Sequence, residues 1–258
     1  MTLTEIPRPG SFSFEGRTAM VTGGAKGVGE AICREIHEGG GNVAICDIDL
    51  AAASAVAGSL DPSGESVMVV SLDVRSKDDF IAGRDAVIAK WSKVDILVNN
   101  AGFAKRTPVD DITPEEFDEI VAINMRSVFL GCQVFKDHMA ENGYGRIVNI
   151  TSLAGQNGGT VASPHYASSK AGAIMLTKYF AQLLADQGIT VNAISPGPIA
   201  TAKARLSDEQ IAMVEGKVPI GRFMEVSEIA AATALLASDR GGFFVGATLD
   251  MNGGLYVR

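Results

Sequence analysis

The chain has 258 residues, 47% of them hydrophobic and 20% charged, and a formal net charge of −8 at pH 7. That length and composition suit one compact α/β domain with a sizeable core. An acidic chain without a run of basic and aromatic residues is a poor partner for nucleic acid, and no apolar stretch approaches the roughly 18 residues of a membrane span.

Residues 1–15 contain prolines and glutamates but no apolar stretch of signal-peptide length. We expect a loose leader there, followed by a single domain over residues 16–258. The cysteines, Cys33, Cys46 and Cys132, are odd in number and unpatterned. They favour a reducing compartment, the cytoplasm, over a disulfide framework.

Short β-branched runs alternate with helical patterns along the chain. The runs are apolar throughout, which indicates burial on both faces, and the regular alternation indicates a parallel sheet. We therefore expect a doubly wound α/β fold, with about seven strands and helices on both faces. The expected strands are Thr18 to Thr22, Val43 to Cys46, Val67 to Leu72, Asp95 to Val98, Ile147 to Ile150, Thr190 to Ile194 and Ala247 to Asp250.

The turn after the first expected strand, residues 22–29, reads Thr-Gly-Gly-Ala-Lys-Gly-Val-Gly. Glycines let the backbone approach a pyrophosphate, whose charge is then met by the N-terminus of a helix beginning near Gly27. The spacing Gly-x-x-x-Gly-x-Gly differs from the commoner dinucleotide fingerprint. Ordinary tight-turn glycines therefore remain the alternative.

Asp47 closes the second strand, eighteen residues after Gly29. A carboxylate there would bond the adenine ribose hydroxyls and repel a 2′-phosphate, whereas Lys26 could attract that phosphate or simply be solvated. We weigh the carboxylate above a mobile lysine and expect NAD, with NADP as the alternative. Asp47 could instead cap the helix starting near Leu50, although Asp49 is better placed to do so.

Small and polar residues follow the next two strands at their carboxyl ends, where ligands bind in such sheets. Asp73 and Val74 follow the third strand, and Asn99-Asn100-Ala101-Gly102 ends the fourth. The latter sequence suits a backbone lying close to a flat ligand. A strand-terminating turn is the alternative.

The sequence Thr113-Pro114-Glu115-Glu116 predicts a helix that opens with a capping box. Asn124 falls in the middle of this helix and is a poor helix former between apolar neighbours. On the sequence alone, a buried structural amide is as good an interpretation of Asn124 as a functional one.

Ser152 follows the fifth strand, fourteen residues before Tyr166. Its hydroxyl can donate to a substrate oxygen as charge develops there. A hydrolase is excluded because Ser152 has no nucleophile elbow of the Gly-x-Ser-x-Gly type. No histidine has metal-ligand spacing to another His or Cys, so we expect no metal.

Tyr166 and Lys170 share one face of a helix that has Ser163 as its N-cap and Pro164 at its first position. A phenol has a pKa of about 10 and acts as a base near neutral pH only if this value falls by roughly three units. A lysine charge about 4 Å away supplies roughly that effect. The pair predicts proton transfer, and we interpret His165 as structural or pocket-lining rather than catalytic.

Together these motifs resemble the single-domain branch of the short-chain dehydrogenase/reductase family, over essentially the whole chain after about Phe14. The order and spacing of the motifs are specific, although each motif alone is a modest signal. The motifs are Thr22 to Gly29, Asp73, Asn99 to Gly102, Asn124, Ser152, Tyr166 with Lys170 as Tyr-x-x-x-Lys, and Asn192 to Gly197.

The resemblance implies a Rossmann-like fold and an NAD(P)-dependent oxidoreductase acting on CH–OH groups. Tyr166 would exchange the proton with the substrate oxygen, and Lys170 would lower its pKa while holding the nicotinamide ribose. Ser152 would position the substrate oxygen, and Asn124 would carry a water-linked proton relay. Asp73 and Asn99 would contact the adenosine half. The cofactor-binding set would be Gly23, Lys26, Gly27, Val28, Gly29, Asp47, Asp73, Val74, Asn100, Ala101, Gly102, Tyr166, Lys170, Pro196, Gly197, Ile199 and Thr201.

For the substrate, we expect a small secondary alcohol or ketone. A 3-oxoacyl-carrier-protein reductase using NADPH is the alternative, but relatives dock the acidic carrier with arginines, and the corresponding stretches here, residues 141–143 and 182–184, carry no cation. A non-catalytic dinucleotide-sensing module is the alternative of another class. It predicts an eroded Ser, Tyr and Lys set, whereas all three residues are present.

Residues 202–221 predict a small helical lid over the pocket, with an ordinary surface helix as the alternative. The resemblance also implies a homotetramer formed through two long helices, at about residues 114–140 and 164–186. The expected pocket wall comprises Phe103, Ser152, Leu153, Gln156, Asn157, His165 and Tyr166.

Overall fold

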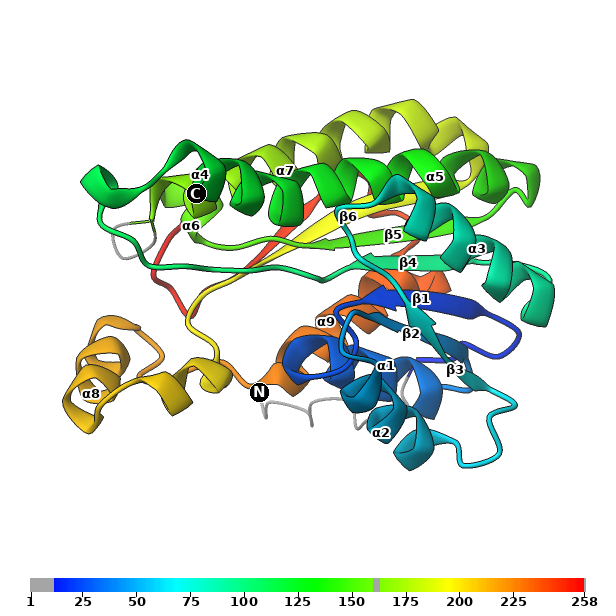
Figure 1. The fold of residues 1–258 in the computed structure, drawn as a ribbon, viewed down its shortest axis with the longest axis horizontal. Helices are drawn as coiled ribbons and strands as arrows, with labels where there is room; N and C mark the ends of the chain where they lie inside the picture. Colours follow the sequence, from blue (N-terminus) through cyan, green and yellow to red (C-terminus); the bar gives the residue numbers. More distant parts are fainter. Residues whose placement is uncertain (1–11, 160–162, 258) are drawn as a thin grey trace, which may run out of the picture.

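The computed structural model describes residues 12–159 and 163–257, so most of the expected leader of residues 1–15 lies outside the described residues. Within the described part, seven parallel strands form one sheet in the order β3-β2-β1-β4-β5-β6-β7 (Figure 1). The order reverses direction between β1 and β4, which confirms the expected doubly wound, Rossmann-like fold. The strands are β1 (Thr18–Thr22), β2 (Asn42–Asp47), β3 (Val67–Ser71), β4 (Ile96–Asn99), β5 (Gly145–Ile150), β6 (Ile189–Pro196) and β7 (Thr248–Met251).

The central strands are buried along their whole length. Every residue of β1, β4, β5 and β6 is buried, as the uninterrupted apolar runs predicted. The observed strand ends differ from the expected ones by one or two residues, which is the usual uncertainty at element ends. Asp95, for example, precedes β4 by one residue, yet its backbone still bonds to Thr18 and Arg146 as a strand residue would.

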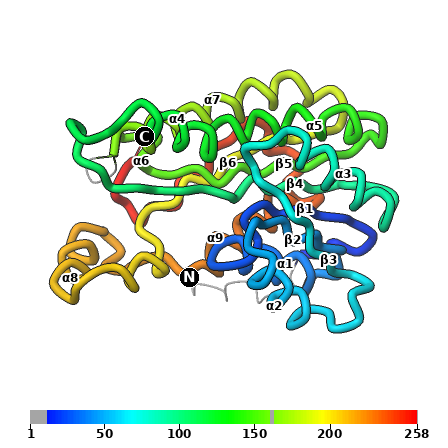
Figure 2. The backbone as a smooth tube through the Cα atoms, in the orientation of Figure 1, coloured from blue at the N-terminus to red at the C-terminus, as the bar shows by residue number. Residues whose placement is uncertain are grey.

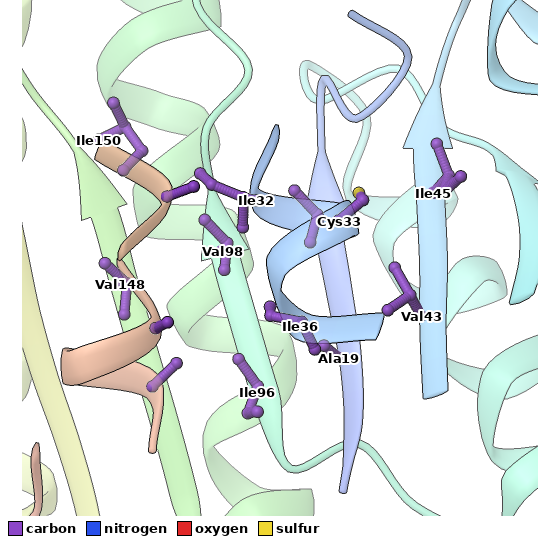
Figure 3. Close-up of a cluster of buried hydrophobic side chains, with 14 of the residues drawn as sticks. Ala19, Ile32, Cys33, Ile36, Val43, Ile45, Ile96, Val98, Val148 and Ile150 are labelled. Carbon is purple, nitrogen blue, oxygen red and sulfur yellow. The ribbon is translucent and has the colours of Figure 1, made fainter. Parts of the chain in front are cut away.

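Alternate residues of each strand enter two hydrophobic cores on opposite faces of the sheet, as the two-residue period of a strand requires. Ala19 and Val21 of β1 enter one core, and Met20 enters the other. In the first core, Ile32 and Ile36 pack onto the strands (Figure 3). The helices on this face are α1 (Gly27–Glu38), α2 (Leu50–Leu60) and α9 (Val226–Ala237).

The second core lies under three long helices, which cover the opposite face of the sheet in Figure 1. Its largest side chains include Phe80, Phe135 and Phe180. This face matters for the site because the helix carrying Tyr166 is anchored here. The helices are α3 (Lys77–Trp91), α5 (Ser127–Glu141) and α7 (Pro164–Leu184).

The long helix expected at about residues 114–140 is interrupted. A π-helical turn at residues 122–126 joins α4 to α5 and contains Asn124, a type of distortion that is frequent at functional sites. Asn124 is therefore held by a local widening of the helix and not by a regular helix interior. The remaining elements are η1 (Val109–Asp111), α4 (Pro114–Val121), η2 (Ala122–Arg126), α6 (Ala154–Asn157), η3 (Ala185–Gln187), η4 (Ala200–Arg205), α8 (Asp208–Lys217) and η5 (Asp239–Gly241).

Two of the expected helix caps are altered by tertiary contacts. Asp49 caps α2 by accepting the Ala52 N–H, as expected. At α4, the Thr113 hydroxyl accepts the Glu116 N–H at 3.2 Å, but the Glu116 carboxylate bonds elsewhere, so the expected capping box is only half formed. Ser163 is the N-cap residue of α7, yet its side chain makes no cap hydrogen bond.

The expected lid over residues 202–221 folds into the short turn η4 and the helix α8. Ser207 and Gln210 form a complete capping box at the start of α8. No residue of α8 is buried, and Figure 2 shows the helix standing apart from the helices that cover the sheet. Among the helices formed by the described residues, none has the length and apolarity needed to cross a membrane.

Candidate active site

Ser152 and Tyr166 meet at the carboxyl end of the sheet. Ser152 lies two residues beyond β5, and Tyr166 lies in the first turn of α7. A hydrogen bond from the Ser152 hydroxyl to the Tyr166 phenol connects them and lowers the pKa of the phenol. The structure therefore places two hydroxyl groups side by side where a doubly wound sheet binds its ligands.

Lys170 lies one helical turn after Tyr166 and is buried. Its ammonium nitrogen donates to the Ile150 carbonyl oxygen at 2.9 Å and lies 6.0 Å from the centre of the Tyr166 ring. Burial lowers the pKa of Lys170 to about 8. The lysine is still mostly protonated at neutral pH, but its hydrogen bond is made to the end of β5 and not to the phenol.

The Tyr166 pKa does not show the lowering that we expected from Lys170, and the effect of the lysine charge on the phenol stays a prediction. The pKa of Tyr166 is raised, because burial of the phenol outweighs the hydrogen bond from Ser152. The ammonium lies 6.0 Å from the centre of the Tyr166 ring, and its hydrogen bond to Ile150 holds it toward the sheet. At neutral pH the phenol is consequently a proton donor.

Asn124 is committed to the backbone of the loop that follows β4. Its side-chain oxygen accepts the Phe103 N–H at 2.9 Å, and its amide nitrogen donates to the Phe103 carbonyl at 2.8 Å. The side chain is 1% exposed. A Cβ on Gly102 would lie 3.1 Å from the Asn124 oxygen and 3.3 Å from the Lys170 nitrogen, so a larger residue would have to displace one of these two side chains slightly.

The glycine-rich turn packs directly against the end of β4. Gly23 has a φ of +63°, and a Cβ there would lie 2.9 Å from the Ala101 Cα. A Cβ on Gly29 would lie 2.1 Å from the Gly23 carbonyl oxygen. The Asn100 side chain donates to the Gly23 carbonyl at 3.0 Å. Asn100 and Ala101 thus shape the turn through short contacts, which explains why small residues occupy both stretches.

The same turn has the features of a dinucleotide cradle. Helix α1 begins at Gly27, which has a φ of +60°, and its N-cap residue Lys26 makes no side-chain cap bond. A Cβ on Gly27 would lie 3.8 Å from the Thr201 methyl group, so the glycine leaves open the space between the helix N-terminus and η4. An anion in that space would meet the positive end of α1. The residues therefore fit the pyrophosphate of NAD or NADP.

Asp47 lies at the end of β2 with both carboxylate oxygens engaged. One oxygen accepts the Ala25 N–H at 3.1 Å, and the other accepts the Asp49 N–H at 3.0 Å. Each carboxylate oxygen can accept more than one hydrogen bond, so these contacts hold the group beside the turn without using up its acceptors. The orientation is consistent with the expected ribose contact.

Two residues expected near the adenosine half are occupied by protein neighbours. The Asp73 carboxylate accepts hydrogen bonds from Arg75, the shortest at 2.6 Å, and these lower its pKa. Asn99 is buried, and its amide donates to the Asn149 side chain at 2.8 Å. The Asn99 side chain thus faces Asn149 and Gly131 of α5, and the expected contact of Asn99 with the adenosine half stays a prediction.

The other expected cofactor residues surround the same edge of the sheet. Val28 and Ile199 pack against the first core, and Val74 packs against the second. The Pro196 carbonyl accepts the Leu153 N–H at 2.9 Å, which joins the ends of β5 and β6. A Cβ on Gly197 would lie 2.9 Å from the Asn252 Cα, so the chain after β6 runs against the chain after β7.

The expected pocket wall is only partly assembled. Phe103 is 46% exposed and is free to face a ligand. Gln156 donates to the carboxylate of Asp250, and Asn157 is exposed and accepts the Gly159 N–H. His165 is wholly buried and bonds to Glu116, so its expected place in the pocket wall is wrong.

A cavity of about 310 Å³ lies beside the end of the lid, and neither Ser152 nor Tyr166 lines it. The expected wall residues, all within the described ranges, do not line it. An ion pair between Arg222 and Glu228, at 2.7 Å, forms part of its wall. The cavity is lined by Pro198, Val218, Ile220, Arg222, Met224, Glu228, Asp250, Met251, Asn252, Gly253 and Gly254.

Sequence reasoning missed the partners that hold the site in place. Glu116 and Thr107 contact the start of α7 from α4 and from the loop after β4. The sequence around Glu116 predicts a capping box, which is a purely local feature. Nothing in the sequence indicated that its carboxylate would be diverted to another helix.

Comparison with known proteins places this geometry in a family. A family model described as Enoyl-(Acyl carrier protein) reductase matches residues 23–256. Acetoacetyl-CoA reductase from Rhizobium meliloti (strain 1021) is 38% identical over 242 residues, covering 93% of this chain and 98% of that protein. The 3-oxoacyl-[acyl-carrier-protein] reductase FabG from Escherichia coli (strain K12) is 37% identical over 248 residues, covering 95% and 99%.

The fold is shared with a solved structure of a proposed gluconate dehydrogenase from Agrobacterium tumefaciens. The two structures match with a TM-score of 0.88 and 29% sequence identity, covering 95% of this chain and 97% of the other. The relatives align over nearly their full lengths, and the glycine-rich turn and the paired hydroxyl groups occupy one edge of the sheet. The chain therefore belongs to the short-chain dehydrogenase/reductase family and is an NAD(P)-dependent oxidoreductase acting on CH–OH and keto groups.

Proposed function

We propose that the protein reduces a 3-oxoacyl compound that is not attached to a carrier protein, with Tyr166 as the proton donor. The hydrogen-bonded pair of Ser152 and Tyr166 is the observation that carries this proposal. The pKa of Tyr166 is raised, so the phenol holds its proton at neutral pH and can transfer it to an alkoxide as a ketone is reduced.

The other polar residues act on the same oxygen or on the cofactor. Ser152 donates a hydrogen bond to the substrate oxygen as negative charge develops there. NADH or NADPH, when bound, supplies the hydride to the carbonyl carbon. Lys170 holds a positive charge beneath the site and is anchored to the end of β5. Asn124 fixes the Phe103 backbone and through it one wall of the substrate pocket.

NAD(H) is the proposed form of the cofactor. Asp47 is held by two backbone N–H groups next to the expected ribose, where its negative charge would repel a 2′-phosphate. Lys26 is exposed at the N-cap of α1, and its charge opposes this effect. We rank the fixed carboxylate above the mobile ammonium because a mobile charge is screened by water and salt.

The substrate class rests on the names of the relatives and on charge. Sequence alone ranked a small alcohol or ketone first, whereas acetoacetyl-CoA reductase and 3-oxoacyl-[acyl-carrier-protein] reductase among the relatives favour a 3-oxoacyl compound. The chain carries a net charge of −8, and the stretches at residues 141–143 and 182–184 contain no cation. An acidic carrier protein would have to dock on this acidic surface and would be repelled, whereas a 3-oxoacyl compound without a protein carrier needs no such docking contact.

The test compares the rates at which different substrates are reduced, measured by the change in nicotinamide absorbance. Purified protein would receive acetoacetyl-CoA, acetoacetyl-carrier protein, ethyl acetoacetate and a panel of simple ketones, each with NADH and with NADPH. We expect the highest kcat/KM for acetoacetyl-CoA with NADH. Equal or faster reduction of the carrier-protein thioester would overturn the substrate assignment, and a preference for NADPH would overturn the cofactor assignment. If no 3-oxo compound is reduced but simple ketones are, the small-ketone alternative holds.

We also propose a cytoplasmic homotetramer that assembles through α5 and α7. An apolar stripe on these helices supports it: Met175, Tyr179 and Leu183 recur every four residues on α7 and are 62%, 61% and 45% exposed. Phe129 of α5 is 38% exposed and contributes to the same surface through its ring contact with Phe180. The buried free cysteines suit a reducing compartment. Light scattering of Tyr179→Glu tests the interface, since a charge there should yield smaller particles.

A further inference from the structure

His165 is a buried titratable group that the proposed chemistry does not use. It is 0% exposed and precedes Tyr166 directly. Its Nδ1 atom accepts the Tyr166 backbone N–H at 2.9 Å, and its Nε2 atom lies 3.0 Å from a carboxylate oxygen of Glu116. A nitrogen that accepts an N–H carries no proton. The contacts therefore specify a neutral ring whose Nε2–H donates to Glu116.

Glu116 extends this contact to a cation, Lys105. Its other carboxylate oxygen accepts a hydrogen bond from the Lys105 ammonium at 2.5 Å. Hydrogen bonds, the largest from Lys105 and a smaller one from His165, lower the pKa of Glu116 to about 2. The carboxylate is therefore ionised throughout the neutral range and can hold both donors. Lys105, Glu116 and His165 form a continuous polar chain from the loop after β4, across α4, to the first turn of α7.

The start of α7 depends on this polar chain because the helix lacks a hydrogen bond from its N-cap side chain. Ser163 is the N-cap residue, but its hydroxyl accepts the Thr107 N–H at 2.9 Å and donates to the Thr107 carbonyl at 3.0 Å. The first N–H groups of a helix have no partner within the helix and are normally met by the cap side chain. Here the His165 ring accepts the N–H of Tyr166 at 2.9 Å, a donor that it shares with the Ser163 carbonyl oxygen at 3.1 Å.

The loop between β4 and α4 is fastened to the site at three places. Asn124 binds Phe103 near its start, Glu116 binds Lys105 in its middle, and Ser163 binds Thr107 near its end. Two of these ties lead into the first turn of α7. A shift of His165 would therefore move both the phenol and the wall that Phe103 provides.

From this geometry we propose that His165 is a positioning residue for Tyr166. It fixes the first turn of α7 through the Tyr166 N–H and is itself fixed by Glu116, which Lys105 holds in turn. The inference rests on the proposed role of Tyr166 as proton donor. The polar chain of Lys105, Glu116 and His165 thereby sets the distance between the Tyr166 and Ser152 hydroxyl groups, and with it the proton affinity of the phenol.

The two contacts of His165 can be removed separately. In His165→Asn the side-chain oxygen occupies the position of Nδ1 and still accepts the Tyr166 N–H, while the bond to Glu116 is lost. In His165→Gln the amide reaches the position of Nε2 and keeps the bond to Glu116. The side-chain acceptor for the Tyr166 N–H is lost, and only the longer bond to the Ser163 carbonyl oxygen remains. Glu116→Gln keeps the shape of the carboxylate but removes its charge. His37→Gln is the matched control. His37 lies on α1, and its Nε2 atom is 3.0 Å from the Ser66 hydroxyl oxygen, so the substitution removes a comparable histidine contact outside α7.

The first readout is acetoacetyl-CoA reduction with NADH as a function of pH. We expect His165→Gln to lower kcat about 10-fold with the KM for NADH unchanged, because a small displacement of a catalytic group is costly while the cofactor site is untouched. His165→Asn and Glu116→Gln should show smaller losses in the same direction. The basic limb of the pH profile should move to higher pH in all three variants but not in His37→Gln.

The second readout does not need turnover. The phenolate absorbance of each variant is titrated and compared with that of the same variant carrying Tyr166→Phe, which isolates Tyr166. Its pKa should rise in the His165 variants, because a displaced phenol loses the hydrogen bond from Ser152. If the wild type reduces no substrate, the proposed function fails, and this titration alone decides the positioning role.

Two results would overturn the inference. One is an unchanged Tyr166 titration in His165→Gln and Glu116→Gln. The other is a loss of kcat that matches the fraction of unfolded protein and leaves the pH profile of the folded fraction unchanged, as a purely structural role requires. If both His165 variants fail to fold, Glu116→Gln and Lys105→Met, which leave the histidine in place, supply the same measurements.

Discussion

The ammonium nitrogen of Lys170 lies 6.0 Å from the centre of the Tyr166 ring, although the two residues share one face of α7. Its hydrogen bond is made at 2.9 Å to the carbonyl of Ile150 at the end of β5. The lysine therefore secures the helix to the sheet as well as placing a charge below the site. Burial raises the free energy of the charged form of Lys170, so the stability of the fold depends on the protonation state of this residue.

Replacing Lys170 with methionine should change how stability depends on pH. The folded pKa is lowered from 10.5 to about 8, so the unfolded chain binds more protons at this residue between those two values. Its contribution to the free energy of unfolding therefore rises with pH in that window. Relative to the wild type, Lys170→Met should lose a stability advantage of about 3 kcal/mol as pH rises from about 8 to 10.5.

Urea unfolding at several pH values measures this difference. Lys178→Met, at an exposed position of the same helix, is the control and should show none of it. A pH-independent difference between Lys170→Met and the wild type would show that the folded pKa of Lys170 is not lowered.

Tyr166→Phe should lower kcat about 1000-fold, which is within the range for loss of a general acid. The KM for NADH should stay nearly constant, because the glycine-rich turn and Asp47 are untouched. Steady-state kinetics with acetoacetyl-CoA provide the measurement. Tyr179→Phe, on the exposed side of the same helix, should retain full activity. Equal turnover in both variants would remove Tyr166 from the mechanism.

Asp47→Asn should shift the cofactor preference toward NADP(H). The substitution keeps a side-chain oxygen for the Ala25 N–H but removes the negative charge beside the expected ribose. We expect the ratio of kcat/KM for NADPH to that for NADH to rise about 10- to 100-fold, since like-charge contacts cost up to several kcal/mol. A ratio equal to that of the wild type would mean that Asp47 does not face the ribose. Asp49→Asn, at the cap of α2, serves as the control.

His138 should make the fold less stable in mild acid. Its Nε2 atom accepts the Val94 N–H at 3.0 Å, and its pKa is lowered from 6.5, mainly by burial and then by the charge of Arg84. The unfolded chain therefore binds the proton first, and stability falls as pH drops below about 6.5 toward the lowered value. His138→Gln offers an oxygen to Val94 without a proton to gain.

Thermal unfolding of the wild type and His138→Gln across this pH range measures the effect. The loss of stability in acid should be smaller in the variant. Parallel curves for the two proteins would assign the acid sensitivity to other groups.

The amino-acid sequence by itself determined the approximate number of strands and the edge of the sheet at which ligands bind. Apolar runs such as Thr18 to Thr22 indicated burial on both faces, and the glycine spacing over residues 23–29 indicated a phosphate-binding turn. The spacing of Tyr166 and Lys170 fixed them on one helix face, because helical geometry is local. Local chemistry also specified the cap of α2 by Asp49.

Tertiary structure decided which partner each polar group took. Asn99 turned to Asn149, Lys170 to Ile150 and the Glu116 carboxylate to His165, all far away in the sequence. Such pairings depend on how helices and strands pack, and a sequence pattern carries no information on the distance between elements. The direction of the Tyr166 pKa was decided in the same way, because burial of the phenol arises only when α7 packs against the sheet.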